Sequence, residues 1–195
     1  MDRFDVVIVG ARCAGSPLAT LLARQGVRVA LVERARFPRD TLSTHIFEAP
    51  GINLLARLGV LDQVRATGAE PIRRLDFRQD EFATRVEPRA RPGDIGGAMS
   101  VRRFLLDPIL AEAAAESGAE VMMKTNVAGL VNNGRVAGVR VRCGGSEREL
   151  AARVVVGADG RNSTVARLDR RAQVPRRCER AVCLLGLLRG HGGRR

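Results

Sequence analysis

The sequence lacks tryptophan and tyrosine and contains only six phenylalanines among its 195 residues. No aromatic residues alternate with the arginines of the C-terminal tail to stack nucleobases, and nucleic-acid binding is not expected. The core must be built from aliphatic side chains, because hydrophobic residues still make up 45% of the chain. This composition is ordinary for an α/β sheet protein.

Cysteine and histidine are also scarce, and their spacing does not suit a metal site. The two histidines are not paired at ligand spacing, and no CxxC occurs among Cys13, Cys143, Cys178 and Cys183. No apolar run approaches the ~18 residues of a membrane-spanning helix, and the N-terminal run is too short for the core of a signal peptide. We expect reduced thiols, no metal, no membrane span and a soluble cytoplasmic protein.

Positive charge is carried by arginine, since Lys124 is the sole lysine and the formal net charge is +12. Residues 161–195 hold ten arginines against two acidic residues, so the rest of the chain is only mildly basic. A basic patch on the folded domain would indicate a nucleic-acid or membrane-surface partner. A general compositional bias explains the arginines equally well. An arginine-tail nucleic-acid binder remains the alternative, and its binding would fall steeply with salt.

The first 32 residues have the pattern of a βαβ unit. Residues 4–9 form an apolar run ended by Gly10, as expected for a parallel strand buried on both faces. A helical pattern over residues 14–25 stops at Gly26, and residues 27–32 form a second strand.

The rest of the chain is predicted to mix helices with a small meander. Short helices are expected over 48–66, a hairpin over 72–89 and a loop over 91–97, followed by a helix over 103–117 and a strand over 120–124. Three meander strands (127–131, 135–141, 147–150) and a separate buried strand (152–156) complete the pattern.

A glycine-rich segment, residues 9–15 (VGARCAG), lies between the first strand and the first helix. Gly10 would allow the tight turn, and Gly15 would let the helix pack close to the strand. The N–H groups at the helix start, beside Ala14, would hold a pyrophosphate. Arg12 replaces the middle glycine, and its Cβ should keep the backbone farther from the phosphate while its guanidinium supplies charge and donors. The segment predicts dinucleotide binding.

Glu33 closes the second strand, eighteen residues after Gly15. At this place a carboxylate can accept both hydroxyls of an adenosine ribose. The alternative is a solvated glutamate at a strand end. Because these features suit any NAD or FAD protein, the choice of cofactor depends on the later motifs.

Residues 153–163 (RVVVGADGRNS) place an aspartate between glycines, after a buried strand and before a helix start. Together with the glycine-rich segment and residues 103–110 (RFLLDPIL), they resemble the FAD-dependent monooxygenases of the para-hydroxybenzoate hydroxylase type and their geranylgeranyl-reductase-like relatives. The resemblance implies an α/β, Rossmann-type FAD-binding domain over residues 1–168, with the hairpin as an insertion, and the incomplete start of a substrate domain over 169–195.

The resemblance also implies roles for particular residues. Asp159 and Gly160 would contact the dinucleotide, Arg103 would reach the flavin cofactor, and Val127 would offer backbone contacts to the adenine. The alternatives are an Asp-Gly turn that caps the next helix and a solvated arginine at a helix N-terminus. Arg102 would replace Arg103 if the register were shifted by one residue.

Two further residues carry less information. Arg34 counts among the cofactor candidates, yet it does not distinguish NADH from NADPH, because this place would hold the adenosine of FAD. His45 ends a segment, residues 40–45 (DTLSTH), that in one branch of the family runs toward the flavin ring. A lone histidine is more often structural, so no catalytic residue is assigned.

The resemblance implies an oxidoreductase that reduces FAD with NADPH or NADH and hydroxylates a small organic substrate. A flavin-dependent reductase of isoprenoid double bonds and a non-catalytic FAD-binding remnant are the alternatives. Complete family members continue to a second Gly-Asp motif, whereas residues 180–189 resemble only the first strand of the substrate domain. A truncated or frameshifted product is therefore the simplest expectation. The substrate and the choice between monomer and homo-oligomer are left open.

Overall fold

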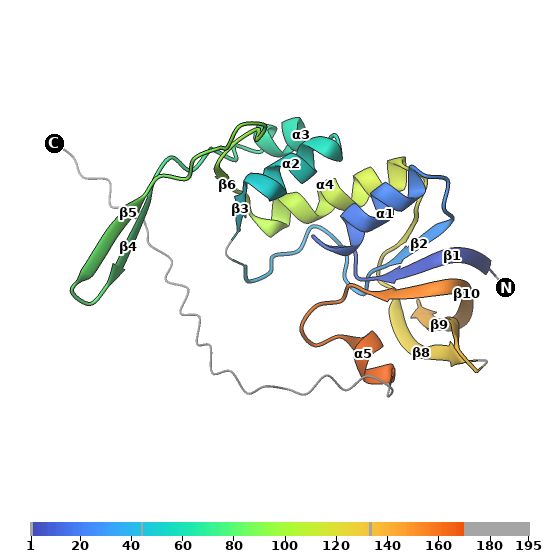
Figure 1. Cartoon of the computed structure of the whole chain (residues 1–195). Coiled ribbons are helices and arrows are strands. Elements are labelled where there is room, and N and C mark those ends of the chain that lie inside the picture. Colours follow the sequence, from blue (N-terminus) through green and yellow to red (C-terminus); the bar gives the residue numbers. More distant parts are fainter. Residues whose placement is uncertain (1, 44, 133, 170–195) are drawn as a thin grey trace.

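The computed structural model of the chain describes residues 2–43, 45–132 and 134–169. Its centre is a six-stranded sheet in the order β7-β2-β1-β10-β9-β8 (Figure 1). Four neighbouring strands are parallel: β7 (Glu120–Met122), β2 (Val29–Val32), β1 (Asp2–Val9) and β10 (Ser146–Gly157). The last two are antiparallel: β9 (Val136–Cys143) and β8 (Asn126–Asn132). The expected α/β class with a mainly parallel sheet and a small meander is confirmed.

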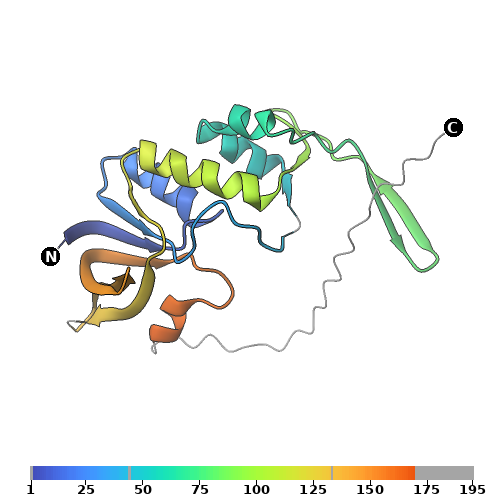
Figure 2. The same ribbon diagram turned by 180° about the vertical axis from the view of Figure 1, so that it is seen from behind.

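Both faces of β1 and β2 are covered at the centre of the sheet, which explains their continuous apolar runs. In β10, Arg153 and Val154 are exposed, so the expectation of a buried strand over residues 152–156 holds only in part. The helices α1 (Gly15–Ala23) and α4 (Arg103–Glu116) lie over one face, and the meander curls across the other (Figures 1 and 2). Ile8 belongs to the core beneath the helices. Its neighbour Val7 belongs to the core under the meander, together with Leu150. Successive side chains of a strand point to opposite faces, so this strand has no solvent-facing side at its centre.

The prediction of separate strands over residues 147–150 and 152–156 is wrong, because β10 is one continuous strand of 12 residues. Its first half pairs with β9 in antiparallel fashion, and its second half pairs with β1 in parallel. Ala151 has a partner on each side, Gly138 and Arg3. No glycine or proline interrupts residues 147–156. The change from alternating to continuous apolar pattern therefore marks a change of neighbours and not a break in the strand.

A third core holds the N-terminal part of α4. The helices α2 (Ala49–Arg57) and α3 (Leu61–Ala66) confirm the predicted short helices, and they pack against α4 through Leu55, Val64 and Leu106. A two-stranded sheet of β3 (Ile46–Glu48) and β6 (Ala98–Ser100) was not predicted. Each of these strands has three residues and its partner is distant in sequence, so neither shows a recognisable period.

The predicted hairpin is confirmed as β4 (Leu75–Gln79) and β5 (Phe82–Val86), which project away from the rest of the domain (Figure 1). Its register puts Phe77 opposite Thr84 and Phe82 opposite Gln79. Both phenylalanines are exposed.

The last described element is the short helix α5 (Thr164–Leu168), which follows the end of β10. The predicted strand over residues 180–189 lies outside the described residues, as does the predicted substrate-domain start apart from Asp169. Within the part of the chain that the structure describes, no helix combines the length and apolar character needed to cross a membrane.

Candidate functional site

A cavity of about 330 Å³ opens where β1, β2 and β10 end. In open α/β sheets, ligands bind in the crevice outside the carboxyl ends of the strands. All predicted cofactor residues but one line this cavity: Gly10, Arg12, Ala14, Glu33, Arg34, Arg103, Val127, Asp159 and Gly160. The exception is Gly15, which is buried behind the loop at the start of α1.

The turn between β1 and α1 is held so tightly that two positions admit only glycine. Gly10 has φ +103°, and a Cβ there would lie 2.5 Å from the carbonyl oxygen of Ala158. A Cβ on Gly15 would lie 1.8 Å from the carbonyl oxygen of Gly10. The Gly10 N–H donates to the Val32 carbonyl at 2.7 Å, and the Ala158 N–H donates to the Val9 carbonyl at 2.7 Å. These contacts bring the ends of three strands together around the turn.

The N-terminus of α1 opens toward the cavity without a capping side chain. Ala14 occupies the N-cap position and forms no side-chain hydrogen bond to the first turn. It also lines the cavity. Unpaired N–H groups and the helix dipole make such an end favourable for an anion.

Glu33 is a buried carboxylate that joins the end of β2 to the glycine turn. Only 4% of the residue is exposed. Its Oε2 accepts the Ala11 N–H at 3.0 Å, and its Oε1 accepts the Ala35 N–H at 2.9 Å. The alternative of a solvated glutamate is therefore wrong. Each carboxylate oxygen has a second lone pair, so both can still accept a ligand hydroxyl.

Arg103 and Arg12 meet at Asp107, a residue that the sequence analysis missed. Arg103 donates from Nε and Nη2 to Asp107 at 2.6 and 3.1 Å, and Arg12 donates from Nη1 at 3.3 Å. Burial raises the pKa of the Asp107 carboxyl, and the two guanidinium groups oppose that shift. The spacing of four residues on one helix face was the available signal for the Arg103–Asp107 pair.

At the start of α4, Arg103 lines the cavity and Arg102 does not. The Arg103 side chain is only 14% exposed, so it is not a solvated arginine. Arg102 instead pairs with Asp40 at the surface and does not line the cavity. His45 accepts the Arg103 N–H at its Nδ1 at 3.3 Å, which gives this lone histidine a structural contact at the helix start.

Asp159 accepts hydrogen bonds at the start of α5, where Ser163 occupies the N-cap position, and it also lines the cavity. Its carboxylate accepts the Ser163 hydroxyl at 2.5 Å and the Thr164 N–H at 2.5 Å. Gly160 has φ +83°, as a turn residue next to the cap. The capping alternative is thus confirmed for the Asp159 side chain, and a contact between this turn and a dinucleotide stays a prediction. Val127 lies at the start of β8 and lines the cavity, and its contact with an adenine also stays a prediction.

Cys13 lines the cavity as an uncharged thiol. Burial raises its pKa to about 11, and its Sγ–H donates to Asp107 Oδ1 at 3.9 Å. A thiol with this pKa is protonated at neutral pH and is a poor nucleophile. Among the described residues, no group of histidine, cysteine, aspartate and glutamate side chains is arranged to hold a metal ion.

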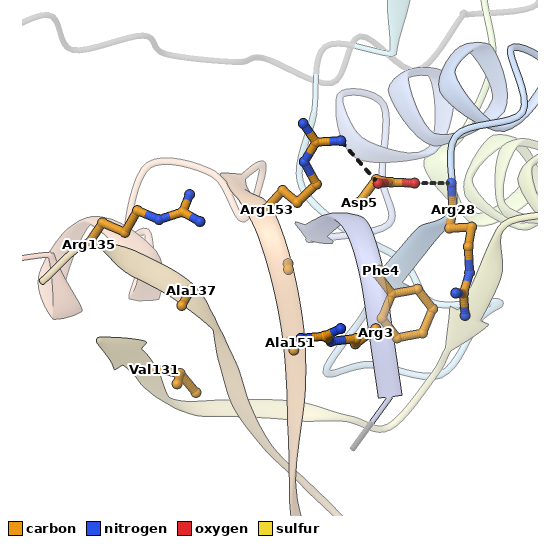
Figure 3. A pocket seen from close by; sticks show the side chains of 10 residues that line it. Arg3, Phe4, Asp5, Arg28, Val131, Arg135, Ala137, Ala151 and Arg153 are labelled. Atoms are coloured by element: carbon orange, nitrogen blue, oxygen red, sulfur yellow. Dashed lines mark hydrogen bonds and ion pairs between the residues drawn. The ribbon is translucent and has the colours of Figure 1, made fainter. Parts of the chain in front are cut away.

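A larger groove, of about 530 Å³, lies at the opposite end of β1 and crosses β10 to the β8–β9 hairpin (Figure 3). Arg3, Arg28 and Arg135 line it, and Asp5 pairs there with Arg153 at 3.6 Å. The groove has neither a glycine turn nor a helix N-terminus. Its chemistry therefore does not match dinucleotide binding, although it is the larger of the two.

A mainly parallel sheet, a glycine turn before an uncapped helix and a buried carboxylate at the end of β2 define a dinucleotide-binding α/β protein. The sequence matches the family described as FAD binding domain over residues 3–182, and the chain belongs to this family. The resemblance proposed from the sequence motifs is thereby confirmed.

Relatives of known activity include both types of enzyme expected from the sequence. The chain is 38% identical to a 6-methylpretetramide 4-monooxygenase of Streptomyces rimosus over 171 residues, which are 84% of this chain and 40% of the relative. It is 33% identical to a digeranylgeranylglycerophospholipid reductase of Methanosarcina mazei over 169 residues, which are 85% of this chain and 40% of the relative. The chain thus spans about 40% of the length of these relatives.

Solved structures agree with this assignment. A myxobacterial chondrochloren halogenase, of the FAD-dependent type, superposes with a TM-score of 0.74 at 28% identity and covers 83% of this chain and 39% of its own. PqsL, a probable FAD-dependent monooxygenase from Pseudomonas aeruginosa, gives 0.71 at 28% identity and covers 85% and 45%. Over the residues matched, the chain has the fold of these FAD-dependent enzymes.

Proposed function

We propose that the cavity at the ends of β1, β2 and β10 holds FAD through the residues predicted from the sequence. The observation that carries the proposal is that nine of these residues, from separate segments of the chain, line one cavity. The donor set suits the cofactor: a tight glycine turn and a helix N-terminus for the diphosphate, and a carboxylate with spare lone pairs for the ribose.

In this arrangement Glu33 would hold the adenosine ribose, with Arg34 beside it and the Val127 backbone near the adenine. The turn from Gly10 to Gly15 would face the diphosphate. Arg103 and the turn at Asp159 would lie along the rest of the cofactor. FAD supplies electron transfer when bound, and the side chains described here bind and orient it.

The reaction proposed for the whole protein is reduction of FAD by NADPH or NADH, followed by hydroxylation of a small organic substrate. The monooxygenase relative, at 38% identity, favours this reaction. The reductase relative, at 33% identity, supports a second candidate, reduction of an isoprenoid double bond. Both candidates use the same cofactor site and differ in what oxidises the reduced flavin.

The test is the absorbance spectrum of the purified chain after incubation with FAD and desalting. NADPH or NADH is then added under anaerobic conditions, and air is admitted afterwards. We expect retained yellow colour, bleaching by one of the two nucleotides, and recovery of the colour in air. Retained colour without bleaching would contradict the proposed reduction by a nicotinamide nucleotide. Absence of colour would contradict FAD binding by this chain.

A matched pair of variants tests the site within the same experiment. Arg103→Met removes a guanidinium that lines the cavity, and loss of a charged hydrogen bond to the cofactor should weaken FAD binding roughly 10-fold or more. Arg102→Met changes the neighbouring arginine, which pairs with Asp40 outside the cavity. It should bind FAD like the unmodified chain. Equal effects of the two substitutions in a flavin fluorescence titration would contradict the proposed position of the cofactor.

A further inference from the structure

Asp107 is the carboxylate around which the two cavity arginines are arranged. It is completely buried, yet it lies on α4, one turn after the start of the helix. Arg103 reaches it from the same helix, and Arg12 reaches it from the turn between β1 and α1. One carboxylate thus ties the glycine turn to α4, across 95 residues of sequence.

The arrangement leaves donors of both arginines available for a ligand. A guanidinium has five N–H donors, whereas Asp107 engages two nitrogens of Arg103 and one of Arg12. The Arg12 guanidinium also lies 5.6 Å from the centre of the Phe37 ring, so it is held from two sides. Both arginines line the cavity next to the uncapped end of α1.

We propose that Asp107 is a positioning residue that fixes Arg12 and Arg103 as one binding unit for the diphosphate of the ligand. The inference rests on the proposed cofactor site and adds to it a residue that never touches the cofactor. It also gives Arg12 a function. The side chain at the position of the missing middle glycine is drawn to one side by Asp107, where it supplies charge to the diphosphate.

Whether Asp107→Asn weakens or tightens diphosphate binding distinguishes a positioning role from a purely electrostatic one. Asp107→Asn removes a negative charge beside an anion site, and by charge alone it should tighten binding of a diphosphate. If positioning dominates, the result is the opposite. An asparagine has one side-chain acceptor oxygen and cannot accept all three of the hydrogen bonds that Asp107 accepts, and its NH2 group would face a guanidinium, so the two arginines are held less firmly. We expect roughly 10-fold weaker binding of ADP and of FAD, as for loss of charged hydrogen bonds.

The experiment compares dissociation constants for FAD, ADP and adenosine, measured by calorimetry or NMR, in the full chain and in Asp107→Asn. Adenosine has no phosphate, so the proposal predicts weaker ADP binding with adenosine binding unchanged. In a background of Arg12→Met with Arg103→Met, the further change Asp107→Asn should leave ADP affinity unaltered within about threefold. Asp76→Asn, which breaks an aspartate–arginine pair in the exposed hairpin, is the control and should change none of the constants.

Each outcome either supports or overturns the positioning role of Asp107. Tighter or unchanged ADP binding in Asp107→Asn would overturn the proposal, and so would an equal loss for ADP and adenosine, which indicates a general loss of structure. If the chain bound ADP with this Asp107 dependence but did not bind FAD, the proposed function would fail and the inference would stand. If it bound neither, both would fail.

Discussion

Replacing Gly15 with alanine is expected to destabilise the domain by about 3 kcal/mol, a large part of the 5–15 kcal/mol that typically holds a domain folded. The new Cβ would lie 1.8 Å from the Gly10 carbonyl oxygen, a backbone atom that cannot rotate away. Alanine gains at most about 1 kcal/mol in helix propensity over glycine, so the steric cost dominates. Urea unfolding followed by circular dichroism measures the difference.

Gly96→Ala is the matched control for this substitution. A Cβ at Gly96 would meet Ile52 Cδ1 at 3.5 Å, which is ordinary van der Waals contact. We expect a change below about 0.5 kcal/mol, typical of substitutions without a strained contact. Equal stability of the Gly15→Ala and Gly96→Ala variants would contradict the close packing of α1 on the turn, and with it the geometry of the cavity.

Glu33→Ala is expected to cost about 2–6 kcal/mol of stability and to abolish measurable FAD binding. Two backbone N–H groups, those of Ala11 and Ala35, would lose their acceptor in a buried place, at about 1–3 kcal/mol each. Glu33→Gln keeps the shape and one acceptor, so its stability loss should be about half as large. Its FAD affinity should still fall at least about 10-fold, because the amide cannot serve both N–H groups and both ribose hydroxyls.

The measurement combines unfolding free energies with FAD titrations of both variants. Glu149→Gln on the exposed surface of β10 serves as the control and should match the unmodified chain in both. If Glu33→Gln bound FAD as tightly as the unmodified chain, Glu33 would have a structural role only. The hydrogen bonds to Ala11 and Ala35 would then be its full function.

The sequence was sufficient for elements whose apolar pattern reflects their own burial. The first strand, α1 and α4 are of this kind, and the glycine turn was recognisable because its context is a strand followed by a helix. The β3–β6 pair was not predictable, since its hydrogen bonds depend on tertiary contacts between two segments of three residues. The continuity of β10 was missed because its neighbours change along its length.

In the candidate site, too, local motifs were predictable and contacts between distant segments were not. Residues that a motif brings to the cavity, such as Gly10 and Glu33, could be selected as candidates from their spacing. Asp107 could not be linked to Arg12, because that contact joins two elements across the fold. The capping bonds of Asp159 were considered only as an alternative, since the motif does not say which atoms its carboxylate contacts.

The most direct test of the FAD site is a map of backbone amide shifts in the ¹⁵N-labelled chain during titration with FAD. The account predicts that the largest changes cluster at the ends of β1, β2 and β10, on Gly10, Ala14, Glu33 and Gly160. Changes that cluster instead in the arginine-lined groove at the opposite end of β1, around Arg3 and Arg135, would contradict it.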